Sequence, residues 1–383
     1  KDLRKVPKIM EDAIDCETSN DDDDDETKMF TIGDNNAPDA KRTKVQEALE
    51  QLRLSRRSQE FQGTVKILCQ PEYAPKLTSL KSLNLYDCQI SKLDGLGDMF
   101  STASPVLETL NLGRNPITDI PPDFVKMQSL QHVWMDDCQL QGELPSPLME
   151  LQNLTSLRLP NNRISEVKLR EKSLDAFDTE IEPQPSLKVL CLDRNALKGL
   201  PVKMNEWVPN LEELMVRHNE LTDLGAETLS SSLRIVHISS NQLTSLDSLM
   251  KESNGSDGSD DVMSQSASQV PNLTHLYANA NRLEKLPAGI LTAHPYLQRL
   301  VVSHNTPLKE MPQEVWDKIE TCDNTVGDSD EEGDDAATGE SCNILWQPNP
   351  NLKKPGSDEK GGEDKEDGGE ATEDVDADDA MEE

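Results

Sequence analysis

A leucine pattern that recurs nine times constrains this chain more than any other feature of its sequence. The pattern is L-x-x-L-x-L-x-x-N/C-x-L, and successive copies begin 22 to 40 residues apart. The copies begin at Leu80, Leu107, Leu130, Leu154, Leu187, Leu211, Leu233, Leu273 and Leu297. One such unit is too small to bury its own apolar face, so the units are expected to stack into a solenoid with a continuous core.

The repeats resemble those of the leucine-rich repeat superfamily over residues 77–318. Endings of the form L-x-x-L-P, or its Met variant, occur at Leu197–Pro201, Leu283–Pro287 and Leu308–Pro312 and are similar to the short intracellular, Ras-group type. The segment LQGELPSPLMELQNL is similar to the plant type. The resemblance implies an α/β fold, a right-handed leucine-rich repeat solenoid shaped as a curved horseshoe, with a parallel sheet on its concave face.

The L-x-L stretch of each repeat predicts a short strand, whose successive side chains point to opposite faces of the sheet. In the fifth repeat, Leu190 and Leu192 are predicted to point into the core, and Cys191 and Asp193 to point outward onto the concave face. Parallel strands lie ~4.8 Å apart, so outward side chains of successive repeats form continuous rows.

The polar residue that follows each strand is predicted to have a structural role. Asn115, Asn195 and Asn241 occupy this position, and an amide side chain both donates and accepts hydrogen bonds. It can therefore satisfy buried backbone groups of the neighbouring turns. Cys88 and Cys138 take the same position in the first and third repeats, where we expect weak structural donors rather than reactive thiols.

Charge divides the chain into four regions. Residues 1–40 carry 13 acidic and 5 basic side chains, and residues 320–383 carry 23 and 4, so both are predicted to be disordered acidic segments. Residues 41–76 are predicted to form an N-terminal helical or strand cap. Residues 77–319 form the predicted domain of nine repeats, interrupted by a Ser/Gly/Asp-rich disordered insert at 250–270.

Three shorter segments carry more specific predictions. Val45, Leu49 and Leu52 have helical spacing, which predicts a capping helix within 44–61. The insertion at 168–186 is predicted to add a short helix and to lie on the convex side or edge of the solenoid. Residues 312–320 are predicted to form the closing cap, with Trp316 sealing the last coil.

The chain lacks the motifs of common catalytic and phosphate-binding sites, namely GxxxxGK[ST], GxSxG, HExxH and GxGxxG. Residues 328–333 begin like a calcium loop, but Gly339 stands where the bidentate Glu is required. We therefore predict a protein that is not an enzyme and has no cofactor, no metal and no small-molecule substrate.

The net charge and the cysteine content limit the classes of partner and the cellular compartment that are expected. The net charge of −34 argues against non-specific binding to nucleic acid or to an anionic membrane. No apolar run approaches the ~18 residues of a membrane span, and no signal peptide is recognisable. Seven scattered cysteines predict reduced thiols. We expect a cytoplasmic monomer, with the nucleus as the alternative location.

The outward residues of the strands are the candidate binding residues. Trp, Tyr and Met are enriched at the centres of protein interfaces, so Trp134, Met215 and Tyr277 favour a protein partner on the concave face. His218, His237 and His275 lie on consecutive repeats, and contact with a partner is favoured over metal binding. The predicted contact residues are Trp134, Arg158, Asp193, Met215, Arg217, His218, His237, Tyr277, Arg299 and His304.

The acidic regions carry two further hypotheses. Ser19, Ser256, Ser259 and Ser329 stand in acidic surroundings and are phosphorylation candidates. The later repeats are richer in Arg and His than the earlier ones, which raises the hypothesis that the acidic tail 320–383 folds back onto them and competes with the partner.

Three functions remain open on the sequence. The first is a non-catalytic protein–protein interaction scaffold or adaptor in intracellular signalling. The second is a protein similar to the acidic nuclear phosphoproteins of this superfamily, which would bind histones or regulate a phosphatase. The third is a regulatory part of a larger signalling enzyme. Fold alone does not choose among them.

Overall fold

The computed structural model describes the residues that carry the repeats. They are 51–56, 61, 63–68, 77–103, 105–169, 171–173, 179–225, 228–250, 268–323 and 343–353, with only the backbone described for 67, 103, 171–173, 179–180 and 322–323. Residues 48–353 belong to one compact unit, and the other unit, 1–47 with 354–383, lies outside the described residues. The disorder predicted for 1–40, 250–270 and 320–383 therefore stays a prediction for the parts of these segments that are not described.

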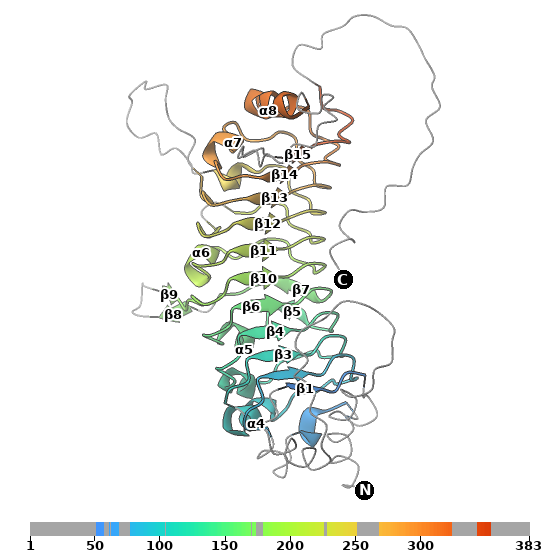
Figure 1. Ribbon diagram of the computed structural model, residues 1–383, viewed down its shortest axis with the longest axis vertical. Coiled ribbons are helices and arrows are strands. Elements are labelled where there is room, and N and C mark those ends of the chain that lie inside the picture. Colours follow the sequence, from blue (N-terminus) through green and yellow to red (C-terminus); the bar gives the residue numbers. More distant parts are fainter. Residues whose placement is uncertain are drawn as a thin grey trace, which may run out of the picture. The chain divides into compact units, whose positions relative to one another are not determined.

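Eleven parallel strands form one sheet within the described residues. They are β1 (Gln51–Arg53), β2 (Ser82–Asn84), β3 (Thr109–Asn111), β4 (His132–Trp134), β6 (Ser156–Arg158), β10 (Val189–Cys191), β11 (Glu213–Met215), β12 (Ile235–His237), β13 (His275–Tyr277), β14 (Arg299–Val301) and β15 (Asn343–Leu345). Figure 1 shows them stacked in chain order. Every predicted repeat supplies one of the nine strands from β2 to β14, which confirms the α/β solenoid.

The core of the solenoid is a stack of aliphatic side chains. The middle residue of each strand points inward, and the register places Leu83 beside Leu110 and Leu190 beside Leu214. All four are buried. The inward leucines therefore form continuous columns, as the alternation of side chains along a strand requires.

An asparagine after most of the strands ties its coil to the coil before it. Asn115 Nδ2 donates to the carbonyls of Leu85 and Leu112, both at 2.8 Å, and its Oδ1 accepts from the backbone N–H of Cys88 at 3.0 Å and of Ile90 at 2.9 Å. Such bonds between coils recur at Asn162, Asn195, Asn219, Asn241, Asn281, Asn305 and Asn349. The predicted role of the amide is confirmed.

The two cysteines at the same position donate in the same direction. Cys88 Sγ donates to the carbonyl of Leu54 at 2.9 Å, and Cys138 Sγ donates to the carbonyl of Leu112 at 3.5 Å. Burial raises the pKa of the Cys138 thiol to about 12. The thiolate is the reactive form of cysteine, so Cys138 is a structural residue, as predicted.

Short helices return the chain from one strand to the next. They are η2 (Val65–Ile67), α4 (Leu96–Ala103), η4 (Pro122–Lys126), α5 (Ser146–Met149), α6 (Met204–Trp207), η5 (Asp247–Leu249), α7 (Ile290–Ala293) and α8 (Gln313–Asp323). In Figure 1, α6 and α7 lie to the left of the stacked strands. A small parallel pair, β5 (Gln141–Glu143) and β7 (Arg163–Glu166), adds to the turns on the other side.

The helix expected within 44–61 is wrong for the part of that segment that the structure describes. Residues 51–53 form β1, which pairs in parallel register with β2. Leu52 and Leu54 are buried there like the leucines of a repeat. Stacking against β2 decides the outcome, because an L-x-L stretch beside an open strand edge completes both the ladder and the core.

The closing end of the sheet also differs from the prediction. Helix α8 contains the buried Trp316, but the sheet continues beyond it into β15, within the segment expected to be a disordered tail. Ile344, Trp346 and Asn349 have the spacing of the inward residues and of the asparagine in a repeat. The predicted boundary at 320 is therefore wrong for residues 343–353.

The insertion at 168–186 forms strands rather than the expected helix. Strands β8 (Glu171–Ser173) and β9 (Thr179–Ile181) pair in an antiparallel hairpin. In Figure 1 the hairpin projects beside β10, away from the turn side of the solenoid. The prediction that the insertion lies on the convex side or edge agrees with this placement.

Candidate functional site

Side chains that point away from the core form one face of the large sheet, which we call the sheet face. Its central row takes the last residue of each strand, and the register places neighbouring members side by side. From β2 to β14 the central row reads Asn84, Asn111, Trp134, Arg158, Cys191, Met215, His237, Tyr277 and Val301. Trp134, Met215 and Tyr277 are partly exposed, as expected for residues on a face open to a partner.

The predicted contact residues divide into two groups along this face. Trp134 and Arg158 are neighbours on β4 and β6. Met215, His237 and Tyr277 are neighbours on β11, β12 and β13. Cys191 lies between the two groups, 3% exposed, so it leaves a small flat position rather than a contact side chain.

The second group contains a stack of rings, which we call the aromatic cluster and define as His237, His275, Tyr277 and Arg299. The rings of His237 and Tyr277 are nearly parallel, at 8°, with centroids 4.0 Å apart. His275 lies 6.3 Å from Tyr277, and the Arg299 guanidinium carbon lies 5.5 Å from the centre of the same ring. A tyrosine face beneath a guanidinium is an attractive cation–π arrangement.

The imidazoles of the cluster are held neutral. Burial lowers the pKa of His237 to about 4, and the positive charge of Arg217 and Arg299 adds to this effect. Burial and Arg299 also lower the pKa of His275. His237 Nδ1 and Arg299 Nε are buried and have no hydrogen-bond partner among the described residues. Each of these two atoms is a buried polar group whose hydrogen bond is unmade among the described residues.

The Asp193 carboxylate binds Arg217 and is not exposed to a partner. Its Oδ1 accepts from the backbone N–H of Arg217 at 2.7 Å, and its Oδ2 accepts from Arg217 Nε and Nη2, both at 2.8 Å. The Asp193 side chain is 4% exposed. The prediction that Asp193 contacts a partner is therefore wrong: the carboxylate orients the arginine, because a buried charge needs its counter-charge and hydrogen bonds.

His218 and His304 belong to a different part of the surface. Both follow their strands and have positive backbone φ, 53° and 57°, in the tight turn that leaves the sheet. Both are exposed. They are available to a partner, but at the rim of the sheet face rather than in its central row.

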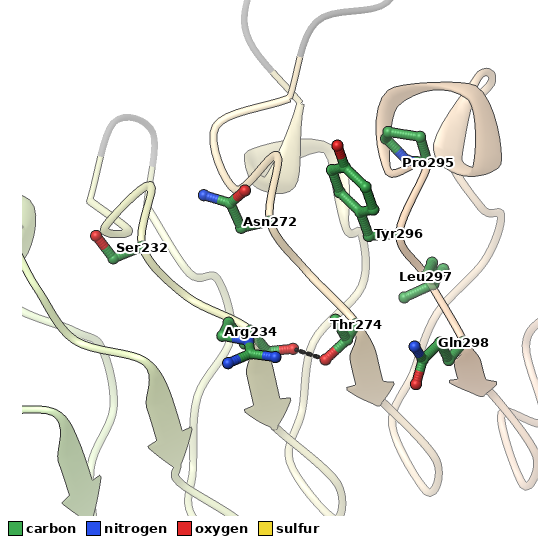
Figure 2. Close-up of a pocket in the computed structure, with 8 residues that line it drawn as sticks. All are labelled: Ser232, Arg234, Asn272, Thr274, Pro295, Tyr296, Leu297 and Gln298. Atoms are coloured by element: carbon green, nitrogen blue, oxygen red, sulfur yellow. Dashed lines mark hydrogen bonds between the residues drawn. The ribbon is translucent and has the colours of Figure 1, made fainter.

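An open pocket at the opposite rim was not predicted from the sequence. It has a volume of about 450 Å³ and lies where the chain enters β12, β13 and β14. Figure 2 shows its lining, which comprises Ser232, Arg234, Asn272, Thr274, Pro295, Tyr296, Leu297 and Gln298. Tyr296 is 59% exposed, an unusual exposure for an aromatic side chain. Tyr296 directly precedes Leu297, the first leucine of the ninth repeat, and this position was the feature of the sequence from which the pocket could have been predicted.

Other predicted sites are outside the described residues or have no structural counterpart among them. Ser19, Ser256, Ser259 and Ser329 are not described. In the described ranges, no three His, Cys, Asp or Glu side chains converge as metal ligands would. No helix in the described part of the chain is both long and apolar enough to cross a membrane.

Comparison with known protein families identifies the repeats. A model described as Leucine Rich Repeat matches residues 106–127, and one described as Leucine Rich repeat matches residues 209–230. A solved leucine-rich repeat protein of Leptospira interrogans has 22% sequence identity and a TM-score of 0.50, covering 72% of this chain and 66% of its own. At this identity the similarity concerns the fold alone.

Curated relatives cover parts of the chain. A protein phosphatase 1 regulatory inhibitor subunit PPP1R7 homolog of Arabidopsis thaliana is 32% identical over 107 residues, which is 27% of this chain and 32% of the relative. Osteomodulin of Bos taurus is 25% identical over 248 residues, 61% of this chain. The chain spans only 27% of the transforming growth factor beta activator LRRC33 of Danio rerio and 53% of osteomodulin.

Proposed function

Because the chain is a leucine-rich repeat protein, we propose that it is a non-catalytic interaction module, a cytoplasmic signalling scaffold or adaptor that binds a protein partner on the sheet face. One observation carries the proposal: large side chains stand partly exposed in the middle of a regular sheet, at Trp134, Met215 and Tyr277. A strand face that meets only water is normally polar, whereas these residue types are enriched at interface centres.

The remaining contact residues support the same surface. Arg158 is exposed beside Trp134, and Arg217 is oriented by Asp193 beside the aromatic cluster. Oriented side chains lose less entropy on binding than free ones. A partner that lies along the sheet face can reach both groups of contact residues, because the rows run continuously from strand to strand.

Affinity capture followed by mass spectrometry tests the proposal. The full chain is compared with a variant carrying Trp134→Ser, Met215→Ser and Tyr277→Ser. Partners captured by the wild type should be lost from this variant, since truncation of central interface anchors costs ~2 kcal/mol or more each. Val202→Ser is the matched control, because Val202 is 78% exposed and lies after β10 outside the sheet face. Partners retained by the triple variant, or lost equally from Val202→Ser, would reject the proposal.

Phosphatase regulation is the second candidate function. The supporting observation is the 32% identity over 107 residues to the PPP1R7 homolog. Binding of a protein phosphatase 1 catalytic subunit, measured by calorimetry with the same variants, tests it. Histone binding, the other activity of the acidic nuclear phosphoprotein alternative, is distinguished by replacing the 14 acidic residues of 354–383 with their amides. That change should abolish histone capture and leave sheet-face partners in place.

A further inference from the structure

Three neighbouring coils of this acidic protein present no carboxylate on the sheet face or its entry rim. The chain carries 72 Asp and Glu residues, yet none falls within 234–240, 274–280 or 298–304, the segments that contain β12, β13 and β14. The same segments carry Arg234, Arg299 and three histidines. The nearest carboxylate row begins on the next strand, where Glu213 stands in register with Ile235.

The two arginines of this surface have unused hydrogen-bonding capacity. Arg299 lies over Tyr277, and its Nε is buried without a partner among the described residues. Arg234 is exposed at the pocket, where its backbone carbonyl accepts from Thr274 Oγ1 at 2.9 Å. Figure 2 shows Arg234 next to Thr274 at one side of the pocket. Neither arginine forms an ion pair with any described residue.

The pocket lies where the chain enters the strands that carry the aromatic cluster. Arg234, Thr274 and Gln298 directly precede the strands that begin with Ile235, His275 and Arg299. Tyr296 stands at the rim, and Tyr277 stands in the central row. Two steps between parallel strands separate Arg234 from Arg299, a span of about 10 Å that about three residues of an extended chain cover. A single peptide segment can therefore reach both guanidinium groups.

We propose that this surface, formed by Arg234, His237, His275, Tyr277, Tyr296 and Arg299, binds an acidic, extended peptide segment of the protein partner. The proposal rests on the proposed function and adds the chemistry of the partner. A guanidinium binds a carboxylate through paired hydrogen bonds, and the two tyrosine rings supply apolar contact to the same segment. Nucleic acid is the less favoured anion, because the net charge of −34 repels a long polyanion.

Fluorescence anisotropy with labelled peptides tests the proposal on the full chain. The probes are an oligoglutamate peptide and an oligoglutamine peptide of equal length. We expect the glutamate peptide to bind and the glutamine peptide not to bind. The double variant Arg234→Gln with Arg299→Gln should weaken binding at least about tenfold, since it removes two charge-assisted interactions. Added salt should weaken binding to the wild type.

Matched variants make the result specific. Arg163→Gln removes an exposed arginine of β7, which lies outside the large sheet, and should leave peptide affinity unchanged. Arg299→Lys keeps the charge and should retain part of the affinity. If the double variant is unstable, the single variant Arg234→Gln replaces it, because it changes only an exposed side chain. Equal binding of the two peptides, or equal loss in Arg163→Gln and the double variant, overturns the proposal.

Two outcomes assign the surface differently. Peptide binding that appears only when the 14 acidic residues of 354–383 are replaced by amides rejects an external partner and gives the surface to the chain's own tail. Absence of glutamate-peptide binding, with capture still lost from the Trp134, Met215 and Tyr277 variant, rejects the acidic peptide and leaves the proposed function standing.

Discussion

At the scale of single residues, His237 is a titratable group that is largely buried within the sheet face. The imidazole is stacked on Tyr277 and surrounded by arginines, and burial holds its pKa at about 4. The face therefore presents a neutral ring at physiological pH.

This depressed pKa predicts a pH dependence of stability. Above pH 6.5 the imidazole is neutral in both states, whereas below it the unfolded chain binds a proton that the folded chain refuses. The free energy of unfolding of the wild type should thus fall by up to ~3 kcal/mol between pH 6.5 and about 4. The decrease over the same pH range should be smaller in His237→Gln, which lacks the imidazole. Urea unfolding at several pH values measures the difference. His304→Gln, at an exposed site, is the control. The same acid loss in wild type and His237→Gln would contradict the assignment.

At the scale of elements, one close approach fixes how successive coils stack on the convex side. The Asp123 carboxylate, at the start of η4, accepts from the backbone N–H groups of Gly97 and Asp98 at the start of α4, at 3.0 and 3.3 Å. The coil-to-coil approach is so tight that a Cβ on Gly97 would lie 1.9 Å from the carbonyl oxygen of Asp123. The glycine is therefore required by the neighbouring coil and not by its own helix.

Gly97→Ala should destabilise the protein although alanine favours a helix. The higher helix propensity of alanine contributes ~1 kcal/mol of stability. The added Cβ, however, overlaps with backbone atoms of the neighbouring coil, which cannot change rotamer as a side chain can. Overpacking of this kind costs ~1–3 kcal/mol or more. We expect a net loss in urea unfolding. Gly199→Ala is the control, since nothing lies within 4 Å of its added Cβ. A Gly97→Ala protein as stable as Gly199→Ala would show that the coils separate easily.

At the scale of the whole solenoid, the last coil protects the one before it. The backbone N–H groups of Val302 and His304 donate to Leu345 and Pro348, both at 2.8 Å, and Asn349 Nδ2 donates to Val302 at 3.0 Å. Trp346 packs edge-to-face on Trp316, with ring centroids 5.4 Å apart. In a solenoid each coil contacts only its neighbours, so loss of this coil should act locally.

Hydrogen–deuterium exchange of Asn349→Ala tests that locality. The amides of 298–308 should exchange faster than in the wild type, because the donors of β14 lose their fixed acceptors. The amides of 187–197, around β10, should be unchanged. Faster exchange across all coils would indicate that the solenoid unfolds as one cooperative unit and not from its end.

The leucine period alone was enough to predict the solenoid, nine of its strands, the inward leucines and the structural asparagines. These features depend on local spacing, because a strand's side chains alternate and each repeat offers the same apolar positions for stacking. The same spacing places one outward residue of each repeat in the central row of the sheet face. The positions of Trp134, Met215 and Tyr277 in that row could therefore be predicted from the sequence.

Contacts between coils decided the rest. Asp193 has the spacing of an outward residue, yet Arg217 of the next coil buries it. Residues 343–353 lie within an acidic stretch, yet they join the sheet because β14 offers them an unpaired edge. The pocket beside Arg234 and Tyr296 exists only where three coils meet. Such features depend on contacts between side chains that are 20 or more residues apart in the sequence and lie on strands ~5 Å apart. The leucine period describes one repeat at a time, so it does not predict these contacts between repeats.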